Sequence, residues 1–152
     1  MSQGGIGINL ETSLGYLLKE ASSALRAAMD EVLRPLGMTV THYSCLELLA
    51  QRPGLSSSEL ARGAFVTRQS MNVLLQALER DGYVSRPMHA PVGKVLPAQL
   101  TPRGRRSLAK ATVAVRSVEV RMLGSMTDAE REGAFRVLKG MIHSLRNSGD
   151  DV

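Results

Sequence analysis

Three amide side chains, those of Gln69, Asn72 and Gln76, are the residues of this sequence best suited to recognition chemistry. They recur at steps of three and four, so a helix over about residues 67–82 would carry them on one face. An amide can both donate to and accept from an adenine edge in the major groove of DNA, and Val73 beside them can contact a thymine methyl. This face predicts a DNA recognition helix, with an ordinary surface amphipathic helix as the alternative.

The same segment has the ends and the inner face of a stable helix. Thr67 can accept a hydrogen bond from an unpaired backbone N–H, and Gly82 can take the left-handed conformation that ends a helix. Arg68, near the positive helix N-terminus, can meet a phosphate or a guanine. The inner face is an apolar stripe that consists of Met71, Leu74, Leu75 and Leu78.

His42 and Cys45 stand three residues apart and invite a catalytic or metal-binding interpretation. No acid or amide at a recognisable spacing completes a nucleophilic set, and the other histidines, His89 and His143, belong to distant elements. A cysteine within an apolar helix usually behaves as a small hydrophobe. We therefore expect no catalytic residues, no metal site and no cofactor.

The composition favours a helical protein with an acidic partner. Hydrophobic residues make up 43% of the 152 residues but aromatic residues only 3%, so the core must consist of Leu, Val, Ala and Met. The net charge of +5 supports nucleic-acid binding without proving specificity. A single cysteine fits a reducing compartment, and the sequence shows neither a signal peptide nor a membrane span. We expect a cytoplasmic protein with no membrane contact.

A short capped helix is predicted before the recognition helix. Ser56 and Glu59 form a capping box that starts a helix over roughly residues 57–62, Gly63 provides the break, and residues 64–66 bridge the turn. A short capped helix, a tight turn and a longer helix with a polar outer face make a helix-turn-helix.

The neighbouring segments predict a buried helix and a wing. Residues 39–51 are apolar around most of a helix, and residues 83–86 and 94–100 read as two short strands joined by a Pro- and Gly-rich connection. A hairpin placed directly after a recognition helix is a wing. Its hydrogen-bond donors are Arg86, His89 and Lys94.

Long helices are predicted at both ends of the chain, over about residues 10–33, 101–124 and 127–146. The first carries a steady apolar stripe with too few local partners to bury it, so a second subunit is a natural cover. Packing within one chain is the alternative.

This order of elements, with several phrases, resembles the MarR family of transcription regulators. The phrases are LGMT at 36–39, SSSELA at 56–61, VTRQSMNVLLQALERDGYVSR at 66–86 and LTPRG at 100–104. The resemblance implies a mainly α (α+β) fold: a winged helix-turn-helix with long dimerisation helices, about six helices and one β-hairpin wing. It also implies a homodimeric repressor that binds a pseudo-palindromic operator on double-stranded DNA and is released by a small molecule of aromatic or phenolic type.

We accordingly divide the chain by role. Residues 10–36 and 102–146 form the dimerisation region and 38–101 the winged helix-turn-helix, between a flexible tail at 1–9 and a frayed end at 147–152. The predicted DNA contacts are Ser57, Thr67, Arg68, Gln69, Ser70, Asn72, Val73, Gln76, Arg86, His89 and Lys94. The predicted dimer interface consists of Leu14, Leu17, Leu18, Leu108, Val115, Met122, Phe135, Leu138, Met141, Ile142 and Leu145. The predicted effector pocket consists of Tyr16, His42, Tyr43 and Arg68.

The wing departs from the family pattern. Family wings often carry Asp-x-Arg or Asp-Gly-Arg, whereas residues 91–94 here read Pro-Val-Gly-Lys, so Lys94 keeps a charge without a bracing carboxylate. Two other functions stay open: a winged-helix module that binds protein, and a redox-responsive regulator based on Cys45. The family's peroxide sensors place their cysteine in the first helix, where this chain has none.

Overall fold

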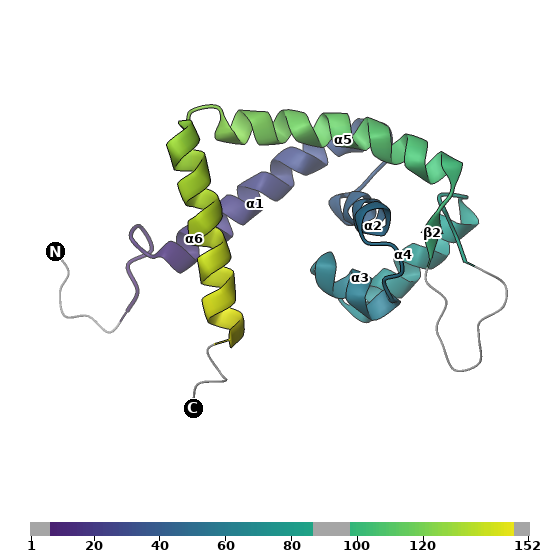
Figure 1. The fold of residues 1–152 in the computed structure, drawn as a ribbon, viewed down its shortest axis with the longest axis horizontal. Helices are drawn as coiled ribbons and strands as arrows, with labels where there is room; N and C mark the ends of the chain where they lie inside the picture. Colours follow the sequence, from purple (N-terminus) through teal and green to yellow (C-terminus); the bar gives the residue numbers. More distant parts are fainter. Residues whose placement is uncertain (1–6, 87–97, 148–152) are drawn as a thin grey trace. The chain divides into compact units, whose positions relative to one another are not determined.

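The computed structural model describes residues 7–86 and 98–147, which are mainly helical (Figure 1). The elements in chain order are α1 (Leu14–Leu33), the short 3-10 helix η1 (Arg34–Leu36), α2 (Val40–Gln51), α3 (Ser57–Gly63), α4 (Arg68–Arg80), β1 (Val84–Ser85), β2 (Gln99–Leu100), α5 (Pro102–Leu123) and α6 (Asp128–Asn147). β1 and β2 pair antiparallel. The predicted fold class is confirmed. None of the helices in the described ranges combines the length and the apolar character that a membrane span requires.

The chain forms two compact units, Met1–Val118 and Glu119–Val152. The first holds α1 to α4, the two strands and most of α5, and the second holds the end of α5 and α6. The boundary lies inside α5, whereas the predicted boundary between the DNA-binding and dimerisation regions lies at its start. The predicted division separates DNA binding from dimerisation, whereas the two units are separated by how compactly their residues pack. The predicted division therefore remains a prediction.

The core of the first unit lies where α2, α3 and α4 meet the end of α1 and the inner face of α5. Its largest fully buried side chains are Leu33, Cys45, Leu46, Leu60, Met71, Leu75 and Val84. Leu108 is also buried, and Val115 packs against the same cluster. Both were predicted at the dimer interface; the structure places Leu108 in the chain's own core and Val115 at its edge, and a dimer contact of this face remains a prediction.

Two predicted helix boundaries need correction. The first helix begins at Leu14 rather than at about Leu10, because the side chain of Ser13 accepts a hydrogen bond from the backbone N–H of Tyr16 at 3.2 Å and caps it there. The break after the third helix does not fall at Gly63, which is itself helical. A Cβ on Gly63 would lie 2.9 Å from Cδ1 of Leu48, so a larger residue there would require the Leu48 side chain to shift.

α6 has the predicted start but not the predicted burial. Thr127 and Glu130 cap it reciprocally, with N···O distances of 3.1 and 2.8 Å. Its apolar side chains were predicted to be buried, and in the single chain none of them is. Four of them are at least 41% exposed: Phe135, Leu138, Ile142 and Leu145.

α5 approaches the end of α4 very closely, and Gly104 makes this approach possible. A Cβ on Gly104 would overlap the carbonyl oxygen of Tyr83. The backbone N–H of Gly104 is donated to Oγ1 of Thr101 at 3.0 Å, and that hydroxyl donates to the carbonyl of Gly82 at 2.6 Å. The start of α5 is thereby fixed against the residues that end the recognition helix.

We predict that Gly104→Ala lowers the free energy of unfolding by about 1–3 kcal/mol, because the new methyl must displace backbone. The melting temperature should fall by several degrees in a thermal scan. Gly140→Ala is the control: that position lies on the face of α6 opposite Leu138 and Ile142 and has nothing within 4 Å of an added Cβ. The control should be neutral or stabilising by up to about 1 kcal/mol; an equal melting temperature for the two variants would contradict the role given to Gly104.

Candidate DNA-binding surface

The two helices of the helix-turn-helix are each fixed at the N-terminus by a side-chain cap. Ser56 and Glu59 form the predicted capping box of α3, with N···O distances of 3.0 and 3.2 Å. The hydroxyl of Thr67 accepts from the backbone N–H of Ser70 at 3.0 Å at the start of α4. α3 and α4 then pack against each other (Figure 1), through the buried side chains of Leu60 and Met71 among others. These contacts set the direction in which the outer face of α4 points.

The outer face of α4 is polar and open to solvent, as predicted. Gln69, Asn72, Val73 and Gln76 are all exposed, and Val73 is 62% exposed although it is apolar. Opposite them, Met71, Leu75 and Leu78 are at most 2% exposed. The helix therefore presents its amides outward from a rigid base.

A hollow of about 390 Å³ lies between the start of α3 and this face of α4. It is lined by Ser56, Ser57, Ser58, Arg68, Asn72, Gln76 and Arg86. Five of these seven were predicted as DNA contacts, and the structure brings them together from α3, α4 and the end of β1. The pattern missed Ser56 and Ser58, although three consecutive serines at a helix start were the available signal.

Arg86 lines the edge of this hollow and has two N–H groups without a partner in the described chain. Among the described residues its Nε and Nη2 atoms have no hydrogen-bond partner, although they are shielded from solvent. The nearest carboxylate, that of Glu79, lies 4.0 Å from Nε, too far for a hydrogen bond. Buried N–H groups normally have an acceptor, so these donors are suited to a phosphate or carboxylate oxygen from outside the chain.

The remaining polar residues predicted to contact DNA are Thr67 and Ser70 at the start of α4, and His89 and Lys94 at the wing. The hydroxyl of Thr67 donates to Oγ of Ser70 at 2.9 Å while it caps α4, so its hydrogen is already engaged. Ser70 keeps its own hydroxyl hydrogen for a phosphate. His89 and Lys94, predicted at the wing, lie outside the described residues.

Comparison with known proteins identifies the family. The MarR family model matches residues 36–94. The transcriptional repressor Rv2887 of Mycobacterium tuberculosis is 42% identical over 134 residues, which cover 88% of this chain and 96% of that protein. The chain belongs to the MarR family.

Solved structures of Rv2887 support the membership. Its complex with salicylic acid superposes with a TM-score of 0.72 over 86% of this chain and 96% of that one, at 42% identity. Its complex with DNA gives a TM-score of 0.70 over 86% and 98% of the two chains, at 41% identity. The predicted family and winged-helix fold are confirmed.

In this MarR-family chain the effector pocket remains a prediction. Of the four residues predicted for the effector, only Arg68 lines the hollow between α3 and α4. The hydroxyl of Tyr43 donates to Oε2 of Glu47 at 3.0 Å, and Tyr16 is 44% exposed. The ring of His42 stands edge-on to Tyr83 with centroids 5.3 Å apart, and its burial lowers the pKa of the imidazole. A neutral His42 fits a packing role.

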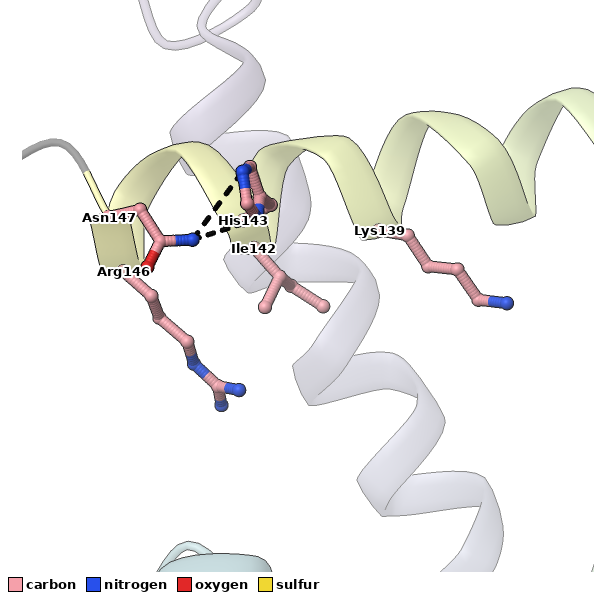
Figure 2. Close-up of a pocket in the computed structure, with 5 residues that line it drawn as sticks. All are labelled: Lys139, Ile142, His143, Arg146 and Asn147. Carbon is pink, nitrogen blue, oxygen red and sulfur yellow. Dashed lines mark hydrogen bonds between the residues drawn. The ribbon is translucent and has the colours of Figure 1, made fainter.

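A second hollow lies along α6 and is lined by five residues of that helix (Figure 2). They are Lys139, Ile142, His143, Arg146 and Asn147. Figure 2 shows Nδ2 of Asn147 reaching His143, at 2.8 Å from Nδ1. The floor is a face of α6 just over two turns long that includes Ile142, a residue predicted for dimerisation.

The structure favours an inert Cys45 over a redox sensor. The side chain is fully buried, and burial raises the pKa of the thiol to about 12, against the proximity of Arg86, which lowers it. Only the thiolate reacts with peroxide, so a shift from 9.0 to about 12 reduces the reactive fraction about a thousandfold.

We predict that native protein at neutral pH is not alkylated by iodoacetamide on the timescale in which urea-unfolded protein reacts fully. Mild peroxide should leave DNA binding unchanged in the wild type and in Cys45→Ser, measured by gel shift. Loss of binding in the wild type alone would establish the redox alternative.

Proposed function

We propose that this protein is a sequence-specific transcriptional repressor that binds operator DNA as a homodimer and releases it on binding a small aromatic acid. The observation that carries the proposal is the convergence of two amides, two arginines and three serines on one open surface at the start of a capped recognition helix. A repressor acts on the chromosome, so we place it in the cytoplasm and assign it no catalytic role.

Base reading and backbone contact are divided between different side chains in this proposal. Gln69, Asn72 and Gln76 read base edges in the major groove, where bidentate amide contacts to adenine carry specificity. Arg68 and Arg86, with Ser57 and Ser70, contact phosphates and set the register of the helix. The wing lacks the acid and arginine pair that is common in the family, so α4 supplies most of the sequence specificity.

The dimer is supported by apolar side chains that one chain leaves open. On α1 the exposed residues include Leu14, Leu17 and Leu18, and on α6 Phe135, Leu138, Ile142 and Leu145. Exposed apolar stripes of this size on long helices are expected to be covered by a second copy. Two recognition helices related by a twofold axis then read two half-sites of a pseudo-palindrome.

The effector class follows from a relative and from the charge of the hollow. Rv2887 was crystallised with salicylic acid and with p-aminosalicylic acid. In this chain Arg68 and Arg86 line a hollow large enough for one such molecule, with N–H groups on Arg86 that lack an acceptor within the described chain. A carboxylate bound there would occupy donors that DNA phosphates need, so acid and DNA would compete.

The proposal predicts that Asn72→Ala and Gln76→Ala each weaken operator binding by about 1–3 kcal/mol while binding to random DNA changes little. The operator is first located by footprinting DNA upstream of the protein's own gene and its neighbours, and affinities are then measured by fluorescence anisotropy. Gln51→Ala, which removes an exposed amide from α2, is the matched control and should bind like the wild type. Failure of the wild type to protect any site would favour the protein-binding alternative.

We further predict that salicylate raises the apparent Kd for operator at least about fivefold. Salicylamide has the same ring and hydroxyl without the carboxylate, and it should have no effect. Both are titrated into the preformed complex and followed by anisotropy. Equal release by the two compounds, or none by salicylate, would refute the carboxylate part of the proposal.

A further inference from the structure

Three helices of this chain end in the same backbone arrangement, and one of them breaks the usual rule for its sequence. In each, one residue with positive φ turns the chain: Gly37 at 72°, Gly82 at 83° and Phe65 at 60°. Each turn is closed by the same two hydrogen bonds, one to the carbonyl three residues back and one from the next residue to the carbonyl five back. Glycine is the usual residue here because a side chain strains the left-handed conformation. Phe65 occupies it with a phenyl ring.

The turn at Phe65 joins the two helices of the DNA-binding motif. Its N–H is donated to the carbonyl of Arg62 at 3.2 Å, and the N–H of Val66 is donated to the carbonyl of Ala61 at 3.0 Å. The backbone hydrogen bonds of the turn are therefore made, and the strain arises because the Cβ of Phe65 crowds the backbone in the left-handed conformation. Phe65 is the one non-glycine residue in the described chain with positive φ.

The ring gains nothing inside the chain to offset this strain. Phe65 is 88% exposed, the most exposed of the large hydrophobic residues that the structure describes. A strained backbone and an exposed aromatic ring at the same residue are two independent departures from a stable surface. Such outliers point to a contact made outside the folded chain.

The position of Phe65 indicates what that contact is. It stands two residues before Thr67, so its Cα lies at most about 7 Å from the Cα of the residue that caps the recognition helix. The N-terminal end of a recognition helix is the part that enters the major groove. Phe65 is thus held at the rim of the groove that α4 enters.

The charges on either side of the ring suit DNA better than an apolar protein partner. Arg62 and Arg68 lie three residues before and after it, and both are exposed. A protein surface that covered the ring would have to desolvate both guanidinium groups. A duplex offers phosphates to the arginines and apolar sugar and thymine-methyl groups to the ring between them.

We propose that Phe65 is a DNA contact: its ring packs against the apolar surface of a nucleotide at the edge of each half-site. The inference rests on the proposed function, because it requires that α4 binds duplex DNA. It adds to the polar recognition set an apolar group from the turn, which carries no charge and contacts no phosphate.

The test uses Phe65→Gly and Phe65→Asn, since both residues tolerate a left-handed backbone. Because the ring is exposed, neither variant should lower the melting temperature. Both should weaken operator binding about tenfold, the effect of losing a partly buried apolar group. The slope of log Kd against log salt should not change, because that slope counts neutralised phosphates. Arg68→Gln, by contrast, should reduce the slope.

Val113→Ala is the matched control, because it removes an apolar side chain that is 71% exposed on α5, away from the helix-turn-helix. It should bind operator like the wild type. Replacing thymine by uracil at the half-site edge removes the base methyl group and distinguishes a methyl contact from a deoxyribose contact. If this replacement weakens operator binding by the wild type but not by Phe65→Asn, the ring contacts the methyl. If it changes neither affinity, the ring contacts deoxyribose.

Two results would overturn the inference without touching the proposed function. One is wild-type affinity for operator in both Phe65 variants; the other is a loss of affinity accompanied by a lower melting temperature, which would make the ring structural. If the wild-type protein binds no DNA, the proposed function fails and this inference fails with it.

Discussion

The orientation of the recognition helix depends on the contact between its C-terminal end and the start of α5. Thr101 occupies the centre of this junction: its backbone N–H is donated to the carbonyl of Tyr83 at 3.1 Å, and its hydroxyl donates to that of Gly82. Because Gly104 has no side chain, the helix can lie directly on the Tyr83 carbonyl. β1 and β2 adjoin the same junction, so helix, strands and α5 are fixed together. The face of α4 that carries the amides is therefore set by a long helix outside the motif.

A second link ties α2 to α5. Oε2 of Glu47 accepts from the hydroxyl of Tyr43 on the same helix and lies 3.4 Å from Oγ1 of Thr112 on α5. With the Thr101 junction, this attaches α2 and the end of the recognition helix to the first part of α5, in addition to the buried cluster that includes Leu108. In the proposed dimer, a displacement of this part of α5 would move the whole motif rather than bend it. The spacing of two recognition helices is then a property of the dimer and not of the motif alone.

Local sequence signals predicted the helix-turn-helix well because each of its boundaries is fixed by neighbouring residues. The capping box at Ser56, the cap at Thr67 and the left-handed Gly82 depend on contacts a few residues apart, and all three are present. The error at Gly63 concerns contacts between distant residues, whereas the start of the first helix was misplaced although its cap at Ser13 is local. Gly63 was predicted to break the helix because glycine commonly does so. Its packing against Leu48 depends on how α2 crosses α3, which the local sequence does not show.

The same limit applies to the apolar stripe of α5 and to the missed residues of the site. A heptad pattern indicates that Leu108 and Val115 pack against another element, but it does not say whether that element belongs to the same chain or to another. Ser56 and Ser58 line the same hollow as Arg86, which follows β1, and the local sequence does not show that these two segments meet. Phe65 was not predicted as a turn residue, because a turn with positive φ is recognised in a sequence by its glycine and not by an aromatic residue.

Three departures from ordinary local rules occur in the helix-turn-helix and at the end of β1. There the chain keeps a phenyl ring at a left-handed position, two shielded guanidinium nitrogens of Arg86 without an acceptor in the described residues, and an exposed Val73 on a polar face. The turns at Gly37 and Gly82 show that the same sequence uses glycine where only a turn is needed. A stable surface would satisfy or remove each of these groups. Their common explanation is a partner that is both anionic and apolar in places, which is the chemistry of a DNA groove and its rim.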